Sequence, residues 1–145
     1  MENKTYKSSS ELDTRNIAKE IAKNLKFGDV VVLTGDLGAG KTAFMNGIAE
    51  YFDILQDICS PTFTIVNEYD LKNGKKIHHF DVYRLEDEEE FLAIGGPDYF
   101  TEDAICFLEW GKIVEDLLPE NTIYIDIERD GISDNNRIIK INGGN

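Results

Sequence analysis

The sequence is poor in cysteine, proline, basic residues and long apolar runs. Its 145 residues include two cysteines and three prolines. Cys59 and Cys106 lie far apart and in no spacing typical of zinc ligands, so we expect reduced thiols and neither a disulfide nor a structural zinc site. No apolar run approaches the ~20 residues that a membrane-spanning helix needs. We therefore expect a soluble, cytoplasmic protein with no membrane contact.

Basic residues are the scarcer charged class. The chain has 15 Lys and Arg against 28 Asp and Glu, which gives a formal net charge of −13. Proteins that bind nucleic acid draw much of their affinity from basic side chains that displace counterions from phosphates. A chain this acidic lacks such a surface. If it serves a nucleic acid, we expect it to do so through a partner.

The length fits one domain, residues 1–145, because single domains commonly have ~100–150 residues. Apolar and β-branched runs predict strands, and helical spacing of apolar residues predicts two early helices, the first capped by Ser10. Asn73-Gly74 predicts a β-hairpin, and five acidic residues from position 86 predict the solvated first turn of a third helix. The predicted strands are 4–8, 30–33, 62–69, 76–83, 104–108, 122–126 and 137–141.

One loop carries the strongest chemical signal. Gly35-Asp-Leu-Gly-Ala-Gly-Lys-Thr42 fits the pattern G-x-x-x-x-G-K-[ST], with an apolar strand before it and a helical pattern after it. Glycines let consecutive backbone N–H groups turn inward around an anion, and the next helix points its positive end at the same place. The lysine adds a cation for the phosphates, and the threonine hydroxyl can bind Mg²⁺. The predicted ATP-binding residues are Gly35, Gly38, Ala39, Gly40, Lys41, Thr42 and Ala43.

This arrangement predicts an α/β fold: a P-loop NTPase-like three-layer sandwich with a mixed sheet and a central β-hairpin. A P-loop enzyme also needs an acid near the metal, commonly at the end of a second apolar strand. Asp81 ends IHHFD and Glu109 ends AICFLE. We expect one to reach the metal shell and the other the attacking water, and the sequence leaves open which does which.

Three further features are weaker. Thr62, in Ser60-Pro-Thr-Phe63, could belong to a loop that senses the terminal phosphate, although an ordinary turn before a strand fits equally well. His78 and His79 are adjacent, so on a strand they face opposite ways, which argues against a shared zinc ion. His79, Asp81 and Tyr83 are expected to share one face of that strand, which could point toward the nucleotide. Trp110 directly follows Glu109 and could simply be a packing residue.

Four ordered motifs, GDLGAGKT, SPTFTIVNEY, HHFDVYRLED and ICFLEW, closely resemble the bacterial TsaE (YjeE) family from about Ser10 to Asp126. The resemblance implies an ATPase needed to make threonylcarbamoyladenosine in tRNA, with Mg-ATP as ligand. It also implies TsaD and TsaB type partners, the transferase and its paralogue, with tRNA met only through that complex. ATP hydrolysis would reset the partners, and activity alone would be low.

By the same resemblance, Lys41 and Thr42 bind the phosphates and Mg²⁺, Thr62 lies in a switch-like loop, and Asp81 and Glu109 are the functional carboxylates. The candidate catalytic residues are thus Lys41, Thr62, Asp81 and Glu109, and the candidate metal ligands are Thr42, Asp81 and Glu109. The resemblance further implies roles for Tyr83, Arg84 and Trp110, and places 10–14 near the adenosine. The family often has proline after Glu-Trp, where this chain has Gly111.

Three other functions are weighed against the ATPase. A small-molecule kinase usually clamps its phosphoryl group with several arginines, and only Arg84 of the four arginines here lies in a candidate site motif. A GTPase would need an Asn-Lys-x-Asp motif to recognise guanine. The single Asn-Lys pair, at 3–4, is followed by Thr5 and Tyr6 and does not complete this motif. A nucleotide-dependent assembly switch, in which ATP binding recruits a partner, uses the same residues as the ATPase and stays open.

Overall fold

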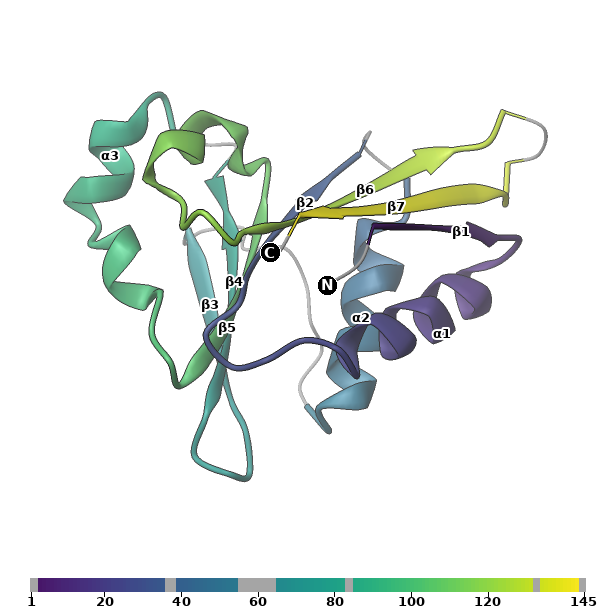
Figure 1. Cartoon of the computed structure of the whole chain (residues 1–145), viewed down its shortest axis with the longest axis horizontal. Coiled ribbons are helices and arrows are strands. Elements are labelled where there is room, and N and C mark those ends of the chain that lie inside the picture. Colours follow the sequence, from purple (N-terminus) through teal and green to yellow (C-terminus); the bar gives the residue numbers. More distant parts are fainter. Residues whose placement is uncertain (1–2, 36–38, 55–64, 83–84, 132–133, 144–145) are drawn as a thin grey trace.

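A seven-stranded mixed sheet runs through the protein (Figure 1). The computed structural model describes residues 3–35, 39–54, 65–82, 85–131 and 134–143. The strand order is β1-β7-β6-β2-β5-β4-β3, and β6, β2, β5 and β4 form its parallel centre. The remaining pairs are antiparallel. The strands are β1 (Lys4–Ser8), β2 (Val30–Thr34), β3 (Val66–Asp70), β4 (Lys76–Asp81), β5 (Ala104–Glu109), β6 (Ile123–Arg129) and β7 (Arg137–Gly143).

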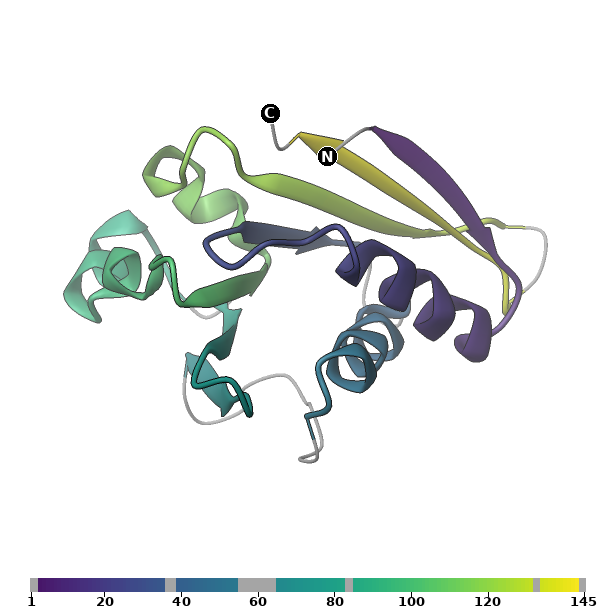
Figure 2. The ribbon, with the colours of Figure 1, turned by 60° about the horizontal axis from the view of Figure 1, so that its bottom comes forward.

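Helices cover both faces of this sheet, which makes three layers (Figure 2). Helices α1 (Glu11–Ala22) and α2 (Lys41–Tyr51) lie on one face. The other face carries α3 (Glu88–Ala93) and the 3₁₀ helices η2 (Gly96–Tyr99) and η3 (Gly111–Leu117). The α/β class, the mixed sheet and the P-loop NTPase-like fold predicted from the sequence are confirmed.

Alternation along the central strands assigns each side chain to a layer. On β5, Ile105 and Phe107 join the core beneath α1 and α2, whereas Cys106 and Leu108 join the core beneath α3 and η3. Both sets are almost fully buried, as expected for parallel strands covered on both sides. Glu109, the next residue, therefore points to the α2 side, where the P-loop helix begins.

The helices on that face start and pack as their sequences require. Ser10 caps α1, because its hydroxyl oxygen accepts from the backbone N–H of Asp13 at 3.0 Å. The Asp13 carboxylate in turn accepts from the backbone N–H of Ser9 at 3.1 Å. Gly47 lies where α2 contacts α1: a Cβ there would fall 2.6 Å from the Cβ of Ala18 and 2.9 Å from the Cα of Arg15. The missing side chain lets the two helices meet closely.

The predicted elements are found with shifted ends. The Asn73-Gly74 hairpin is present and joins β3 to β4 at one edge of the sheet. β6 extends to Arg129, beyond the predicted end at 126: Ile127 continues the buried alternation, and Glu128 and Arg129 still pair with β7. The acidic helix begins at Glu88 with Asp87 as its N-cap. In the residues that the structure describes, no helix has the length and apolar character needed to cross a bilayer.

Candidate functional site

The junction between β2 and α2 prepares the start of α2 for an anion. Gly35 has φ 143°, and a Cβ on it would collide with the carbonyl oxygen of Ile127 in β6. Only glycine fits that position. Gly40, at the N-cap of α2, has left-handed φ 108°, and no side chain of the described residues caps the helix. The start of α2 therefore carries no side-chain cap, and a helix start of this kind can bind a phosphate.

Lys41, the first residue of α2, is only 8% exposed. Its Nζ donates to the carbonyl oxygen of Gly35 at 2.7 Å and lies 4.3 Å from the centre of the Trp110 ring. A carbonyl dipole and an aromatic face both stabilise an ammonium group, but less than a phosphate would. The lysine is therefore held at the site by contacts that a triphosphate can replace.

Two carboxylates end neighbouring strands on the same side as Lys41. Asp81 pairs with Glu109 in the parallel register of β4 and β5, and Leu33 of β2 pairs with Glu109 on its other side. Glu109 is 5% exposed, and its Oε2 lies 2.6 Å from the Nε2 of His79. The expected common face of His79 and Asp81 is confirmed. His78 faces the opposite layer, where its ring meets the Tyr99 ring edge-on.

Trp110 makes a sharp turn just after Glu109. Its φ of 64° is in the left-handed region, which is uncommon for a residue with a side chain. It is the N-cap of η3, and its backbone N–H donates to the carbonyl oxygen of Leu33 at 3.3 Å. This turn places the indole over Lys41, so Trp110 is a site residue as well as a packing residue.

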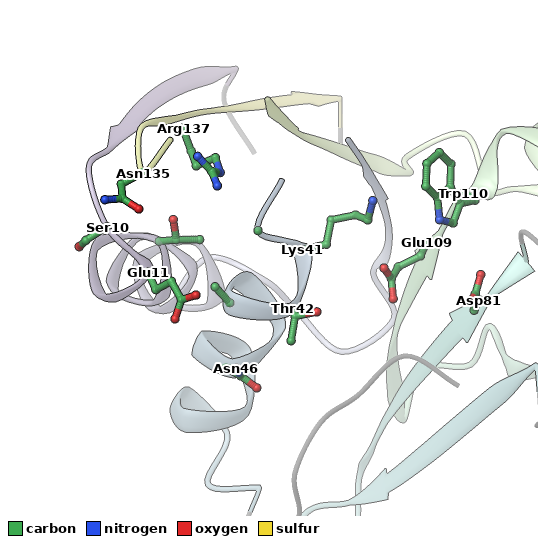
Figure 3. A pocket seen from close by; sticks show the side chains of 13 residues that line it. Ser10, Glu11, Lys41, Thr42, Asn46, Asp81, Glu109, Trp110, Asn135 and Arg137 are labelled. Atoms are coloured by element: carbon green, nitrogen blue, oxygen red, sulfur yellow. The ribbon is translucent and has the colours of Figure 1, made fainter. Parts of the chain in front are cut away.

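A cavity of about 670 Å³ connects these groups. Its volume is in the range of small-molecule sites, which usually hold ~300–1,000 Å³. In Figure 3 the carboxylate of Glu109 points toward Lys41 and Thr42, with Asp81 beyond it. The opposite end is formed by α1 and the start of β7. The lining residues are Ser10, Glu11, Thr14, Gly40, Lys41, Thr42, Ala43, Asn46, Asp81, Glu109, Trp110, Asn135 and Arg137.

Strand direction explains why these residues meet. β2, β4 and β5 are parallel, so the P-loop, Asp81 and Glu109 all follow carboxyl ends at one edge of the sheet. β7 runs back from that edge, and its first residue, Arg137, pairs with Ser8 at the end of β1. The start of α1 is thereby brought to the same edge. Ligands of open α/β sheets bind at this edge as a rule.

Most of the predicted ATP-binding residues that the structure describes lie in or against this cavity. Gly40, Lys41, Thr42 and Ala43 line it, and Gly35 accepts the lysine hydrogen bond. Ala39 is buried, with its carbonyl group turned to β7. Ser10 and Thr14, which the family resemblance placed near the adenosine, also line it. The predictions for Gly38, Ser60, Thr62, Tyr83 and Arg84 fall outside the described residues.

Sequence reasoning missed the β7 side of the cavity, above all Arg137. Its Nε donates to the carbonyl oxygen of Ala39 at 2.8 Å, and its Nη1 donates to the carbonyl oxygen of Asn136 at 2.9 Å. The arginine thus ties the P-loop to β7. Ninety-eight positions separate it from Ala39, and no local pattern marks such a contact. The sequence count of site arginines, which considered only Arg84, must therefore include Arg137.

The oxygen groups around Lys41 suit Mg²⁺. The Thr42 hydroxyl and the carboxylates of Asp81 and Glu109 are hard oxygen ligands, and all three line the cavity. No group of three or more His, Cys, Asp or Glu side chains in the described parts of the chain could hold a metal alone. Mg²⁺ commonly takes one or two protein groups together with substrate phosphates, so this donor set fits it.

Comparison with known proteins gives a consistent result. A family model for "Threonylcarbamoyl adenosine biosynthesis protein TsaE" matches residues 8–139. The tRNA threonylcarbamoyladenosine biosynthesis protein TsaE of Bacillus subtilis is 44% identical over 119 residues, 82% of this chain and 73% of that protein. Its namesake from Treponema pallidum is 38% identical over 135 residues, 92% and 96% of the two chains. The crystal structure of Bacillus subtilis YdiB matches with a TM-score of 0.75 at 34% identity, covering 99% of this chain and 87% of that one.

Proposed function

This chain belongs to the TsaE family of threonylcarbamoyl adenosine biosynthesis proteins, and from that membership we propose that it is the ATPase of the machinery that makes threonylcarbamoyladenosine in tRNA. The reaction proposed is hydrolysis of ATP to ADP and phosphate. The observation that carries the proposal is one cavity in which Lys41 and Thr42 of the P-loop helix face Asp81 and Glu109.

Phosphate binding would use the loop and the start of α2. The N–H groups at Gly40, Lys41 and Thr42 begin a helix whose positive end faces the cavity. Lys41 would exchange the Gly35 carbonyl for phosphate oxygens. Donors fixed before the reaction stabilise charge that develops in the transition state, and losing one such donor typically costs ~10²–10³ in rate.

Mg²⁺, bound with the nucleotide, would supply Lewis-acid stabilisation of phosphate charge. The Thr42 hydroxyl and Glu109 would hold it. We assign Glu109 to the metal side because its strand, β5, borders the P-loop strand β2, whereas Asp81 lies one strand further away. Asp81 would then orient the attacking water and accept its proton at a carboxylate oxygen.

Slow turnover by the isolated protein is part of the proposal. Arg137 lines the cavity, but its Nε and Nη1 donate to backbone carbonyls, so it serves to hold the loop. A charge-stabilising arginine supplied by a partner raises turnover ~10³–10⁵-fold in enzymes that use one. We propose that TsaD and TsaB type proteins are the partners that stimulate this ATPase. The net charge of −13 supports contact with tRNA through those partners only.

The test is ATP binding by calorimetry and phosphate release, measured on the protein alone and with TsaD and TsaB type partners and tRNA. We expect binding, slow release alone and faster release with partners. Lys41→Ala should abolish both. The control is Lys76→Ala, which removes an exposed lysine at the opposite end of β4. Folded protein that takes up no ATP, with or without partners, would refute the proposal.

Variants of the two carboxylates distinguish an ATPase from an assembly switch that needs only nucleotide binding. Asp81→Asn and Glu109→Gln should each cut turnover ~10²-fold or more, the usual range for loss of a positioned acid or base. Glu109→Gln should also raise the Mg²⁺ concentration needed for ATP binding, and Asp81→Asn should not. If a variant that binds ATP without hydrolysing it still supports full tRNA modification by the partners, nucleotide binding alone is sufficient and the switch is favoured.

A further inference from the structure

A short hydrogen bond joins two buried ionisable side chains, His79 and Glu109. Nε2 of the ring lies 2.6 Å from Oε2 of the carboxylate. The histidine is 1% exposed and the glutamate 5%. A buried carboxylate needs hydrogen-bond donors to offset the solvation it has lost. His79 supplies one of them within the protein itself.

Strand pairing makes this contact a consequence of the fold. In the β4–β5 register His79 lies opposite Phe107, and Asp81 lies opposite Glu109. His79 therefore lies two residues before Asp81 on β4, on the same face of the sheet as Asp81 and Glu109. The neighbouring positions of that face, Ile77 and Phe107, are apolar and fully buried. Burial on this face favours an apolar side chain, so burial alone does not account for a histidine at position 79.

Of the two nitrogen atoms of the His79 ring, only Nε2 has a hydrogen-bond partner in the described residues. Its Nδ1 is buried without a hydrogen-bond partner in the described residues. An ionised carboxylate oxygen can only accept a hydrogen bond, so the ring nitrogen in this contact carries the proton. Nε2–H therefore donates to Glu109, and this is the hydrogen bond that the structure gives the ring.

We propose that His79 is a positioning residue for Glu109: its Nε2–H fixes Oε2 of the carboxylate, and so sets how Glu109 faces the phosphate and Mg²⁺ site. The proposal rests on the ATPase function above. It assigns His79 no contact with substrate, because its Nε2 is occupied by Glu109. Groups that orient a metal ligand through a hydrogen bond commonly change affinity or activity ~10–100-fold when lost.

His78 offers a matched control on the same strand. It is the adjacent residue, also buried, but it points to the other layer. There its Nδ1 lies 3.5 Å from Oε1 of Glu68 and its ring contacts Tyr99. A general effect of losing a buried histidine from β4 should appear with His78→Leu as well as with His79→Leu. An effect on Glu109 should appear with His79→Leu alone.

The variants are His79→Leu, His79→Asn and His79→Gln. Leucine removes the donor. The asparagine side chain places its amide nitrogen near the position of Nδ1 and is too short to reach Glu109. The longer glutamine side chain can place its amide nitrogen near the position of Nε2. Each protein is measured for ATP affinity by calorimetry with and without Mg²⁺, and for kcat and KM of phosphate release. If His79→Leu does not fold, the comparison of asparagine with glutamine carries the same test.

For His79→Leu and His79→Asn we expect a loss of ~10–100-fold in kcat and in the Mg²⁺-dependent part of ATP affinity. Affinity without Mg²⁺ should stay close to wild type, His79→Gln should recover most of the loss, and His78→Leu should behave as wild type. In addition, His79→Leu combined with Glu109→Gln should be no worse than Glu109→Gln alone, because both act through one carboxylate.

Three results would overturn the proposal: equal behaviour of the His79→Leu and His78→Leu proteins, no recovery with glutamine, or additive losses in the double variant. Each of these can occur while wild-type protein hydrolyses ATP normally. If wild-type protein binds no ATP at all, the ATPase proposal fails first and this one falls with it. The two failures are therefore distinguishable.

Discussion

Replacing Gly47 with alanine sets two physical effects against each other. Gly47 lies in the interior of α2, where glycine costs ~0.5–1 kcal/mol relative to alanine in helix stability. On helix propensity alone, Gly47→Ala would stabilise the protein. Gly47 also lies where α2 meets α1, and its surroundings leave no room for a methyl group.

The structure decides which effect is larger. The new Cβ would lie 2.6 Å from the Cβ of Ala18, 2.9 Å from the Cα of Arg15 and closer still to the Arg15 carbonyl oxygen. Ordinary carbon contacts need ~3.5–4.0 Å. Two of these neighbours are backbone atoms, so no side-chain rotation relieves the overlap and α1 must shift. Overpacking of this kind costs ~1–3 kcal/mol, and we take ~2–3 kcal/mol here because the backbone is involved.

The net result expected is a loss of about 1–2 kcal/mol after the helix-propensity gain is subtracted. For a chain of this size that corresponds to a fall in Tm of about 2–8 °C. Because α1 carries Ser10 and Thr14 of the cavity wall and α2 carries Thr42, ATP affinity should fall as well. Urea and thermal unfolding measure the first effect, and calorimetry measures the second.

Ala49→Gly is the control, because it measures what glycine costs elsewhere in the same helix. It should destabilise the protein by about 1 kcal/mol or slightly more. A Gly47→Ala protein that is as stable as wild type, or more stable, would mean that propensity outweighs the overlap. The close contact between α1 and α2 would then not be a structural requirement.

Two predictions concern single side chains elsewhere. Trp110 is the sole tryptophan and lies over the Nζ of Lys41, so its fluorescence should change when ATP draws the lysine away; a flat titration of protein that calorimetry shows to bind ATP would contradict this geometry. Burial lowers the pKa of His78 from 6.5, and this effect is larger than the opposite effect of the Glu68 carboxylate. The unfolded chain therefore binds the proton of this histidine more readily than the folded protein does below pH 6.5. The stability of the protein should fall as the pH falls. Urea midpoints between pH 7 and pH 5 should therefore decline less in His78→Leu than in wild type, and equal declines would contradict the assignment.

Much of the fold was predictable because its signals are local. Val30–Thr34 is a buried parallel strand and reads as an unbroken apolar run, and Asn73-Gly74 specifies a hairpin through its turn geometry. Ser10 indicates the start of α1 through its capping hydroxyl. The end of β6 was less predictable, because Glu128 and Arg129 are exposed and their pairing with β7 decides how far the strand continues.

The candidate site divides in the same way. The glycine-rich loop and the two strand-end carboxylates follow from short stretches, so the amino-acid sequence alone is enough to propose Lys41, Asp81 and Glu109 as site residues. It does not identify Arg137, because the contact of that arginine with Ala39 joins positions 98 residues apart. The sequence placed His79 on the same face as Asp81, but only the register of β4 against β5 brings its ring to Glu109.

The sequence by itself thus determined the glycine-rich loop that we propose binds phosphate, the order of strands and helices, and the acids that end two strands. These depend on backbone freedom and on alternation within a few residues. The tertiary structure alone decided that the arginine of β7 and the histidine behind Glu109 lie beside the loop. The reason is that neighbours in a sheet are chosen by the packing of both its faces, a property of the whole chain that no short segment contains.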